Sequence, residues 1–194
     1  MNRFITFEGI DGSGKSTVSK KVFEKLKSEG YDVVLTFEPT DTYIGKCVQR
    51  FIKEGKDPFS TAFAFIADRI DHCKKIKKWL DAGKIVICDR YSESTYAYQS
   101  AQMEEIIDNP IKWLKNLSDD RIIIPDLTFL FFIEPKEAIK RIQNREELVP
   151  FEKKDFLKKV HENYLKLANE KRFVKLDAKK SIDELTNECI KYIK

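Results

Sequence analysis

The residues best suited to chemistry form one run near the start of the chain, Gly9-Ile10-Asp11-Gly12-Ser13-Gly14-Lys15-Ser16. This run fits the pattern GxxxxGKS/T of a phosphate-binding loop, with an apolar run before it and a helical stripe after it. Its glycines let backbone N–H groups turn towards a phosphate, and a helix start adds partial positive charge. Lys15 would reach the β- and γ-phosphates, and Ser16 would ligate Mg²⁺. The alternative is a glycine-rich turn that only caps a helix.

The phosphate-binding loop alone does not choose among kinases, GTPases and ATPase motors. The chain has no Asn-Lys-x-Asp sequence to read guanine, and no apolar strand ends in the Asp-Glu pair of an ATPase motor. A small-molecule kinase is therefore favoured, which needs a second site for an acceptor in line with the γ-phosphate and away from water. The alternative from another class is a switch or binding protein that holds nucleotide without transferring phosphate.

A second apolar run, at residues 85–88, is followed by Asp89-Arg90-Tyr91. Ligands of open α/β sheets bind at the carboxyl edge of the strands, where these residues would lie. Asp89 would hold a Mg²⁺-bound water, and Arg90 would neutralise an acceptor phosphate. The alternative is a surface ion pair at the end of a strand, because polar residues often follow strands.

A long helical pattern precedes that run, from residue 60 to residue 82. Its core-facing stripe is predicted to comprise Phe63, Ile66, Ile70, Cys73, Ile76 and Leu80. Another face carries Phe65 and Arg69, which would stack on a flat base and donate to a base carbonyl. The alternative is a core phenylalanine, with Arg69 paired to a nearby acid such as Asp68. His72, on the same face, is interpreted as an ordinary helix histidine.

Short β-rich runs alternate with helical patterns along the whole chain. The predicted strands span residues 4–8, 32–37, 85–88, 127–133 and 173–176. Predicted helices cover residues 15–29 and 60–82, and Ser181 with Glu184 forms a capping box that opens a last helix. Strands separated by helices imply right-handed crossovers and a mostly parallel sheet. We therefore predict one domain over residues 1–194, an α/β fold of three layers in which helices flank five parallel strands.

The composition is that of an ordinary globular domain, with 194 residues of which 42% are hydrophobic and 35% charged. The net charge of +4 is too small for a dedicated nucleic-acid binder, and no apolar stretch is long enough to span a membrane. The four cysteines form no CxxC pair and are predicted to be buried, reduced thiols. Because no signal-peptide core follows the first residues, we expect a cytoplasmic protein.

Five segments in order along nearly the whole chain carry a more specific pattern. They are residues 7–17, Glu38-Pro39-Thr40, Phe65-Ile66-Ala67-Asp68-Arg69, residues 89–99 from Asp89-Arg90-Tyr91 to Tyr98-Gln99, and Pro125-Asp126-Leu127. Together they resemble thymidylate kinases, which are P-loop nucleoside monophosphate kinases. The resemblance implies that ATP and dTMP give ADP and dTDP for dTTP biosynthesis, with Mg²⁺ and usually in a homodimer. The nearest alternative is a kinase of the same fold for a deoxynucleoside or another monophosphate.

The resemblance also implies a role for individual residues. The ATP site would comprise Gly9, Ile10, Asp11, Gly12, Ser13, Gly14, Lys15, Ser16 and Thr17. The dTMP site would comprise Asp11, Glu38, Arg50, Phe65, Arg69, Arg90, Thr95, Tyr98 and Gln99. In it, Asp11 would contact the sugar 3′-hydroxyl and Tyr98 would leave no room for a 2′-hydroxyl. Catalysis would fall to Lys15, Asp89, Arg90, Arg141 and Arg145, with Mg²⁺ at Ser16 and, through water, at Asp89.

Two departures from the family pattern concern positive charge. Some relatives carry a basic residue in the loop where this chain has Gly12. The charge over the transferring phosphoryl group would then come from Arg141 or Arg145, in a short lid near residues 141–153. Many relatives also have an arginine where this chain has Phe37. We expect Arg50 to compensate at the acceptor phosphate; the alternative is an exposed helix arginine.

Overall fold

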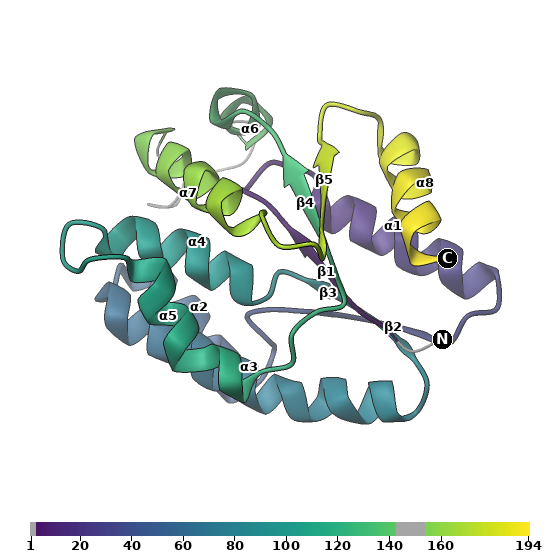
Figure 1. Ribbon diagram of the computed structural model, residues 1–194, viewed down its shortest axis with the longest axis horizontal. Helices are drawn as coiled ribbons and strands as arrows, with labels where there is room; N and C mark the ends of the chain where they lie inside the picture. Colours follow the sequence, from purple (N-terminus) through teal and green to yellow (C-terminus); the bar gives the residue numbers. More distant parts are fainter. Residues whose placement is uncertain (1–2, 143–153) are drawn as a thin grey trace.

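The computed structural model describes residues 3–142 and 154–194, which form one parallel sheet with helices on both faces (Figure 1). The strands are β1 (Arg3–Glu8), β2 (Val33–Phe37), β3 (Ile85–Asp89), β4 (Leu127–Phe132) and β5 (Phe173–Asp177). Their order in the sheet is β2-β3-β1-β4-β5, and every neighbouring pair is parallel. The predicted three-layer α/β fold is confirmed, and each strand begins and ends within one residue of its predicted bounds.

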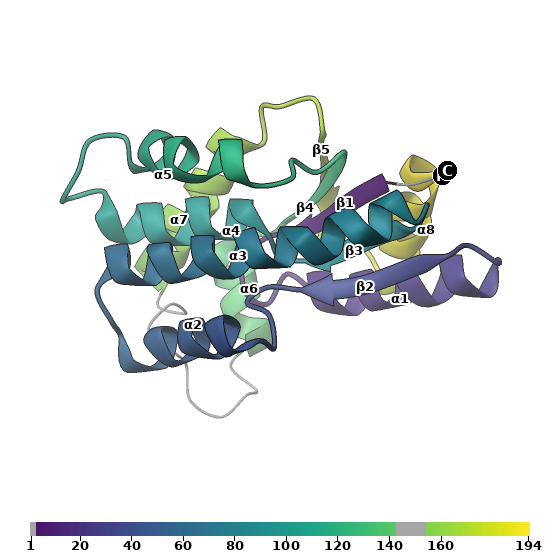
Figure 2. The same cartoon turned by 90° about the horizontal axis from the view of Figure 1, so that it is seen from below.

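The helices divide between the two faces of the sheet. They are α1 (Lys15–Ser28), α2 (Tyr43–Glu54), α3 (Pro58–Asp81), α4 (Ser92–Met103), α5 (Pro110–Ser118), α6 (Pro135–Ile142), α7 (Lys154–Leu167) and α8 (Ile182–Ile193), with a 3₁₀ turn at Asp119–Arg121. Helices α1 and α8 pack together on one face, and α3, α4 and α7 lie on the other (Figure 1). Helix α2 packs against α3 (Figure 2).

The sheet brings two candidate segments to one edge because its central strands are parallel. Strand β1 lies between β3 and β4 and is buried from Phe4 to Glu8. Residue Phe7 of β1 is in register with Asp89 of β3, and the Arg90 N–H donates to the Phe7 carbonyl oxygen at 3.0 Å. The phosphate-binding loop, which follows β1, therefore begins beside Arg90.

Helix ends follow the predicted signals. Gly30, after α1, and Gly83, after α3, have φ of 88° and 80°, in the left-handed region that favours glycine. Ser181 and Glu184 form the predicted capping box at the start of α8. In the part of the chain that the structure describes, no helix is both long and apolar enough to cross a bilayer.

The prediction for the inward face of α3 is wrong at Phe63. This side chain is 52% exposed, and its ring lies 6.0 Å from that of Trp113 on α5. The face of α3 that carries Phe65, Arg69 and His72 is buried instead. Polar side chains can occupy it because partners on neighbouring elements satisfy their hydrogen bonds.

All four cysteines are free thiols, as predicted. Cys73, Cys88 and Cys189 are buried, but Cys47 on α2 is only half-buried. Its helix lies at the outside of the molecule, against α3, so its side chains reach less of the core than those on the other helices.

Candidate active site

The phosphate-binding loop connects β1 to α1 and is tightly enclosed at one position. Gly12 has φ of 81°, and a Cβ atom there would lie 2.5 Å from the carbonyl oxygen of Ala138 on α6. Backbone does not move aside as a flexible side chain can, so a side chain at position 12 would require α6 to shift from its position in this structure. This contact favours glycine at position 12.

Lys15 and Asp11 place opposite charges inside this loop. The Lys15 side chain is buried, with Nζ 3.9 Å from Asp11 Oδ1. Burial, followed by repulsion from Arg90, lowers the pKa of Lys15 to about 8. Burial opposes ionisation of Asp11, but Arg90 and Lys15 outweigh it and lower the pKa of Asp11 to about 2. The loop therefore presents an ammonium group at neutral pH.

A cavity of about 190 Å³ opens beside the loop. Its lining residues are Asp11, Glu38, Pro39, Ile52, Phe65, Arg69, Arg90, Tyr91, Ser94, Tyr98 and Gln99. They come from segments far apart in sequence, and seven of them are residues predicted for the acceptor. Phe65 supplies an apolar wall and is 9% exposed. A flat, partly polar molecule fits such a lining.

Arg69 is completely buried at this cavity, and most of its hydrogen bonds are already made within the protein. Its Nε donates to Glu38 Oε2 at 2.8 Å, and its Nη2 donates to the Tyr91 carbonyl oxygen at 3.1 Å and to Thr95 Oγ1 at 2.9 Å. Its Nη1 has no hydrogen-bond partner among the described residues. Arg69, which lines the cavity, thus keeps one N–H donor group, Nη1, that no group among the described residues uses.

The acid that pairs with Arg69 is therefore Glu38, and not the neighbouring Asp68. Asp68 accepts from the backbone N–H of Thr40 at 2.7 Å and from the Thr40 hydroxyl at 2.6 Å. It holds the loop after β2, on which Glu38 stands. Thr95 and Gln99 both lie on α4, and Gln99 Oε1 has no partner among the described residues.

Arg90 joins the cavity to the phosphate-binding loop. It has φ of 68°, rare for a residue other than glycine, and its Nη2 lies 2.5 Å from Asp11 Oδ1. Its Nη1 donates to Ser94 Oγ at 3.1 Å and to the Gly9 carbonyl oxygen at 3.3 Å. The Tyr98 hydroxyl donates to Asp11 Oδ2 at 2.9 Å. The arrangement places a guanidinium group between the two sites.

Asp89 and Ser16 are the predicted metal ligands. Asp89 Oδ1 is buried without a hydrogen-bond partner among the described residues, and Ser16 opens α1 with its side chain exposed. No cluster of three or more His, Cys, Asp or Glu side chains suited to a metal occurs in residues 3–142 and 154–194. Mg²⁺ bound largely by phosphate oxygens needs only one or two protein ligands, so the two residues fit that ion.

Three predicted arginines lie away from the cavity or outside the described residues. The Arg50 side chain on α2 is 76% exposed, and its Nε contacts Glu54 at 2.6 Å. Arg141 on α6 donates from Nη2 to the Ala178 carbonyl oxygen, just after β5, at 3.0 Å. Arg145 and the lid segment at residues 143–153 lie outside the described residues.

Glu8, at the end of β1, is a buried carboxyl group that the sequence reasoning did not single out. Its oxygens accept from the Tyr91 N–H at 2.7 Å, the Ser94 hydroxyl at 2.6 Å and the Tyr164 hydroxyl at 2.9 Å. Burial, together with the nearby charge of Glu93, raises the pKa of Glu8 to about 7. The signal that marks it is a charged residue in an otherwise apolar, central strand.

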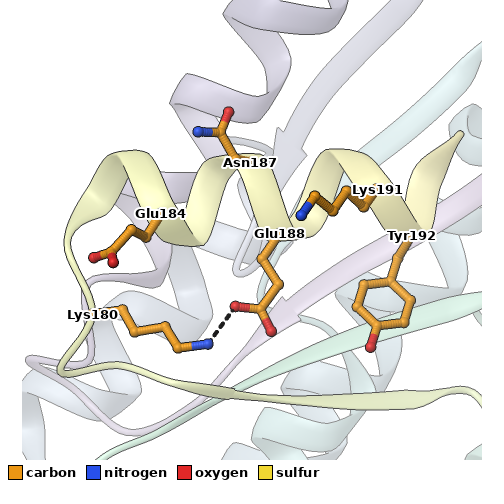
Figure 3. A pocket seen from close by; sticks show the side chains of 6 residues that line it. All are labelled: Lys180, Glu184, Asn187, Glu188, Lys191 and Tyr192. Atoms are coloured by element: carbon orange, nitrogen blue, oxygen red, sulfur yellow. Dashed lines mark hydrogen bonds and ion pairs between the residues drawn. The ribbon is translucent and has the colours of Figure 1, made fainter.

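A second depression, on α8, contains none of the predicted site residues. It is lined by Lys180, Glu184, Asn187, Glu188, Lys191 and Tyr192 (Figure 3). Lys180 Nζ pairs with Glu188 there at 2.7 Å (Figure 3). These side chains stand on an open, charged surface, which is typical of a solvated helix face.

Comparisons with known proteins agree with this geometry. A family model described as thymidylate kinase matches residues 7–189. A probable thymidylate kinase of Methanosarcina mazei is 44% identical over 195 residues, which cover 98% of this chain and 95% of that protein. Proteins of the same description from Methanocaldococcus jannaschii and Sulfurisphaera tokodaii are each 41% identical and cover 100% of this chain and 96% of their own length. With similarity over its whole length and a phosphate-binding loop beside a base-sized cavity, the chain belongs to the thymidylate kinase family.

Proposed function

We propose that this protein transfers the γ-phosphoryl group of ATP to dTMP, giving ADP and dTDP for dTTP biosynthesis. The observation that carries the proposal is the unpartnered Nη1 of Arg69, a residue that lines the cavity beside the phosphate-binding loop. A buried donor without a partner costs about 1–3 kcal/mol. A pyrimidine carbonyl in the cavity would supply the missing acceptor.

The base and sugar of dTMP would be read by side chains that line or support this cavity. Phe65 stacks on thymine and Arg69 donates to its O4, with Thr95 and Gln99 beside the base. Asp11 contacts the 3′-hydroxyl. Tyr98, whose hydroxyl is bonded to Asp11, occupies the space that a 2′-hydroxyl would need, so deoxyribose is preferred.

Phosphoryl transfer needs positioning and positive charge, and not a protein nucleophile. Arg90 holds the acceptor phosphate, and Lys15 holds the β- and γ-phosphates of ATP. Ser16 and, through water, Asp89 hold Mg²⁺, which neutralises phosphate charge when bound. Asp89 and Arg90 stand at the carboxyl end of β3, and Lys15 and Ser16 stand at the start of α1, directly after the loop that follows β1.

The remaining positive charge would come from arginines outside the cavity. Arg141 and Arg145, in a short lid segment near residues 141–153, would supply charge over the transferring group, because Gly12 brings no basic side chain to it. Arg50 would turn from Glu54 to the acceptor phosphate, where relatives use an arginine in place of Phe37. We also propose a cytoplasmic location, where ATP and nucleotides are both present.

The function is tested by a panel of acceptors in an assay for ADP release. We expect dTMP to be the best substrate, dUMP to be weaker, and dCMP, AMP, thymidine and ribothymidine monophosphate to be poor. Preference for an acceptor other than dTMP or dUMP would instead indicate a related kinase. Nucleotide binding without any acceptor-dependent ADP release would indicate a binding protein.

Replacing Arg69 by alanine should weaken dTMP binding by about 1–3 kcal/mol, because a buried hydrogen bond to the base is lost. The affinity for ATP should stay nearly unchanged, since the hydrogen bonds of Arg69 go to Glu38, Tyr91 and Thr95 and not to the phosphate-binding loop. Isothermal titration calorimetry with dTMP and with ATP measures the two affinities. Equal losses for dTMP and ATP would instead point to damaged folding.

The affinity for ATP should fall as the pH rises above about 8. The Lys15 ammonium, whose pKa is about 8, carries its charge below that pH and loses it above, so the attraction to phosphate disappears. For a site that needs the charged form, Kd at pH 9 should be about tenfold its value at pH 7. The Lys15→Arg variant keeps its charge and should give a flatter profile. Equal slopes for both proteins would contradict this assignment.

We propose that the protein is a homodimer that pairs through α3 and α5. Phe63 on α3 and Leu117 on α5 are 52% and 38% exposed. Trp113 lies four residues before Leu117, one turn away on α5, and its ring lies against that of Phe63. Apolar groups gathered on one surface mark an interaction site. Light scattering should give twice the chain mass of 22.8 kDa, and the Phe63→Glu variant should be monomeric. A monomeric wild type would contradict the proposal.

A further inference from the structure

A chain of buried polar groups runs from β2 to the cavity through His72. Thr36 Oγ1 lies 2.8 Å from His72 Nε2, and His72 Nδ1 lies 2.9 Å from Glu38 Oε1. The other oxygen of Glu38, Oε2, accepts from Arg69 Nε at 2.8 Å. His72 is 3% exposed and Glu38 4%, so these contacts are shielded from water. His72, interpreted from sequence as an ordinary helix histidine, is thus linked through Glu38 to Arg69, the arginine proposed to bind the base.

The chemistry of the groups determines the direction of each hydrogen bond. A carboxylate only accepts, so His72 Nδ1 must carry the proton that Glu38 Oε1 receives. In a neutral imidazole, Nε2 is then an acceptor, and the Thr36 hydroxyl donates to it. Glu38 therefore fixes the tautomer of His72, and the Thr36 hydroxyl supports that tautomer by donating to Nε2.

The contact with His72 keeps one oxygen of Glu38 away from Arg69. Carboxylates and guanidinium groups favour a bidentate pairing with two parallel N–H···O bonds. Here Glu38 Oε1 accepts from His72, so Arg69 donates a single hydrogen bond to Glu38, from Nε to Oε2. Its Nη2 is then available to Tyr91 and Thr95, and the planar group is held with Nη1 as the unpartnered donor.

We propose that His72 is a positioning residue for base recognition: by holding Glu38 in single-oxygen contact, it aims Nη1 of Arg69 at the nucleobase carbonyl. The inference rests on the proposed contact between Arg69 and dTMP. Without His72, Glu38 Oε1 competes for the guanidinium group and turns it from the orientation that the base requires. The role predicts a loss in dTMP binding and base discrimination, not in the use of ATP.

Two substitutions at His72 separate its two hydrogen bonds. His72→Asn places an amide nitrogen near the position of Nδ1 and keeps the bond to Glu38. His72→Gln places its amide near the position of Nε2, so it keeps the contact with Thr36 and loses the one with Glu38. The matched control is His161→Asn, at the other histidine of the chain, which packs on the Phe132 ring at 4.7 Å.

The readout is a set of steady-state constants for dTMP, dCMP and ATP. For His72→Gln we expect KM for dTMP to rise about tenfold, with kcat and KM for ATP within about twofold of wild type. The preference for dTMP over dCMP, which has an amino group in place of O4, should narrow. His72→Asn and His161→Asn should stay within about threefold of wild type in every constant. Thermal melting of each variant confirms that it is folded.

A second substitution tests the same network if His72→Gln does not fold. Thr36→Val is nearly isosteric, removes the hydroxyl that donates to His72 Nε2, and should raise KM for dTMP about threefold. Unchanged KM for dTMP in both Thr36→Val and His72→Gln overturns the proposal, as do equal losses for dTMP and ATP. If the wild-type protein phosphorylates dTMP and the His72 variants have the same KM for dTMP, only this inference is refuted. If the wild-type protein does not phosphorylate dTMP, the proposed function is refuted as well.

Discussion

Replacing Lys15 by methionine is expected to lower kcat by about a hundred- to a thousandfold while the protein stays at least as stable to heat as wild type. The loss follows from removing a buried cation that meets charge developing on the phosphates. Burial and Arg90 lower the pKa of Lys15 from 10.5 to about 8, so the folded chain bears a cost of a few kcal/mol for holding it charged at neutral pH. Methionine keeps the apolar stem and removes that cost.

The difference in thermal stability between Lys15→Met and wild type should depend on pH if it arises from the buried charge of Lys15. Folding depresses the pKa of Lys15, so the cost is fully present below about pH 8 and disappears as the pH rises towards 10.5, where the unfolded chain also loses the proton. The gain of Lys15→Met in thermal melting should therefore shrink over that interval. Turnover close to wild type, or a variant that melts well below wild type at pH 7, would contradict the role given to Lys15.

Replacing Arg90 by alanine is expected to lower kcat/KM for dTMP by about a thousandfold and to destabilise the fold. The ion pair between Arg90 and Asp11 is partly buried, so removing Arg90 leaves the Asp11 charge without its compensating partner. Arg90 is the partner of Asp11 at 2.5 Å and also donates to Ser94 and Gly9. The acceptor phosphate and the Asp11 carboxylate would then face each other without the intervening guanidinium group.

Three measurements distinguish the role of Arg90 in binding from its role in folding. Melting curves report the lost ion pair, and KM for ATP reports whether the phosphate-binding loop is intact; we expect it to change less than about threefold. Arg90→Lys keeps the charge but not the planar fork, so its kcat/KM should lie between wild type and Arg90→Ala. A dTMP KM that alanine leaves unchanged would exclude contact between Arg90 and the acceptor phosphate.

Local patterns predicted those parts of the molecule whose structure depends on adjacent residues. The strands and the helices α1, α3 and α8 show clear apolar periodicity and end at glycines or begin at a capping box. Helix α4 was not predicted, because it is buried almost throughout although many of its side chains are polar, so it shows no apolar stripe opposite a polar face. Its serines and tyrosines form hydrogen bonds with distant segments, such as that between Ser94 and Glu8, which leave no period in the sequence.

The acceptor site shows the same division at the level of single side chains. Phe65, Arg69 and Arg90 were predicted and are brought together at one cavity. The acidic partner of Arg69 was not predicted, because Glu38 is 31 residues away in sequence. The two side chains meet only when the loop after β2 packs on α3. Arg50 has the charge to bind phosphate, but its helix directs it to Glu54 at the surface.

The sequence by itself determined the phosphate-binding loop and the order of strands and helices, because contiguous residues set backbone angles, apolar stripes and helix ends. Only the tertiary structure decided which acid holds Arg69, that Glu8 and His72 are buried in hydrogen-bond networks, and that a side chain at position 12 would meet the backbone of α6. These outcomes depend on atoms that meet across β1, β2, α3, α4 and α6. A pairing between distant segments is selected by packing and by the cost of leaving buried polar groups unpaired, and neither is encoded in the spacing of neighbouring residues.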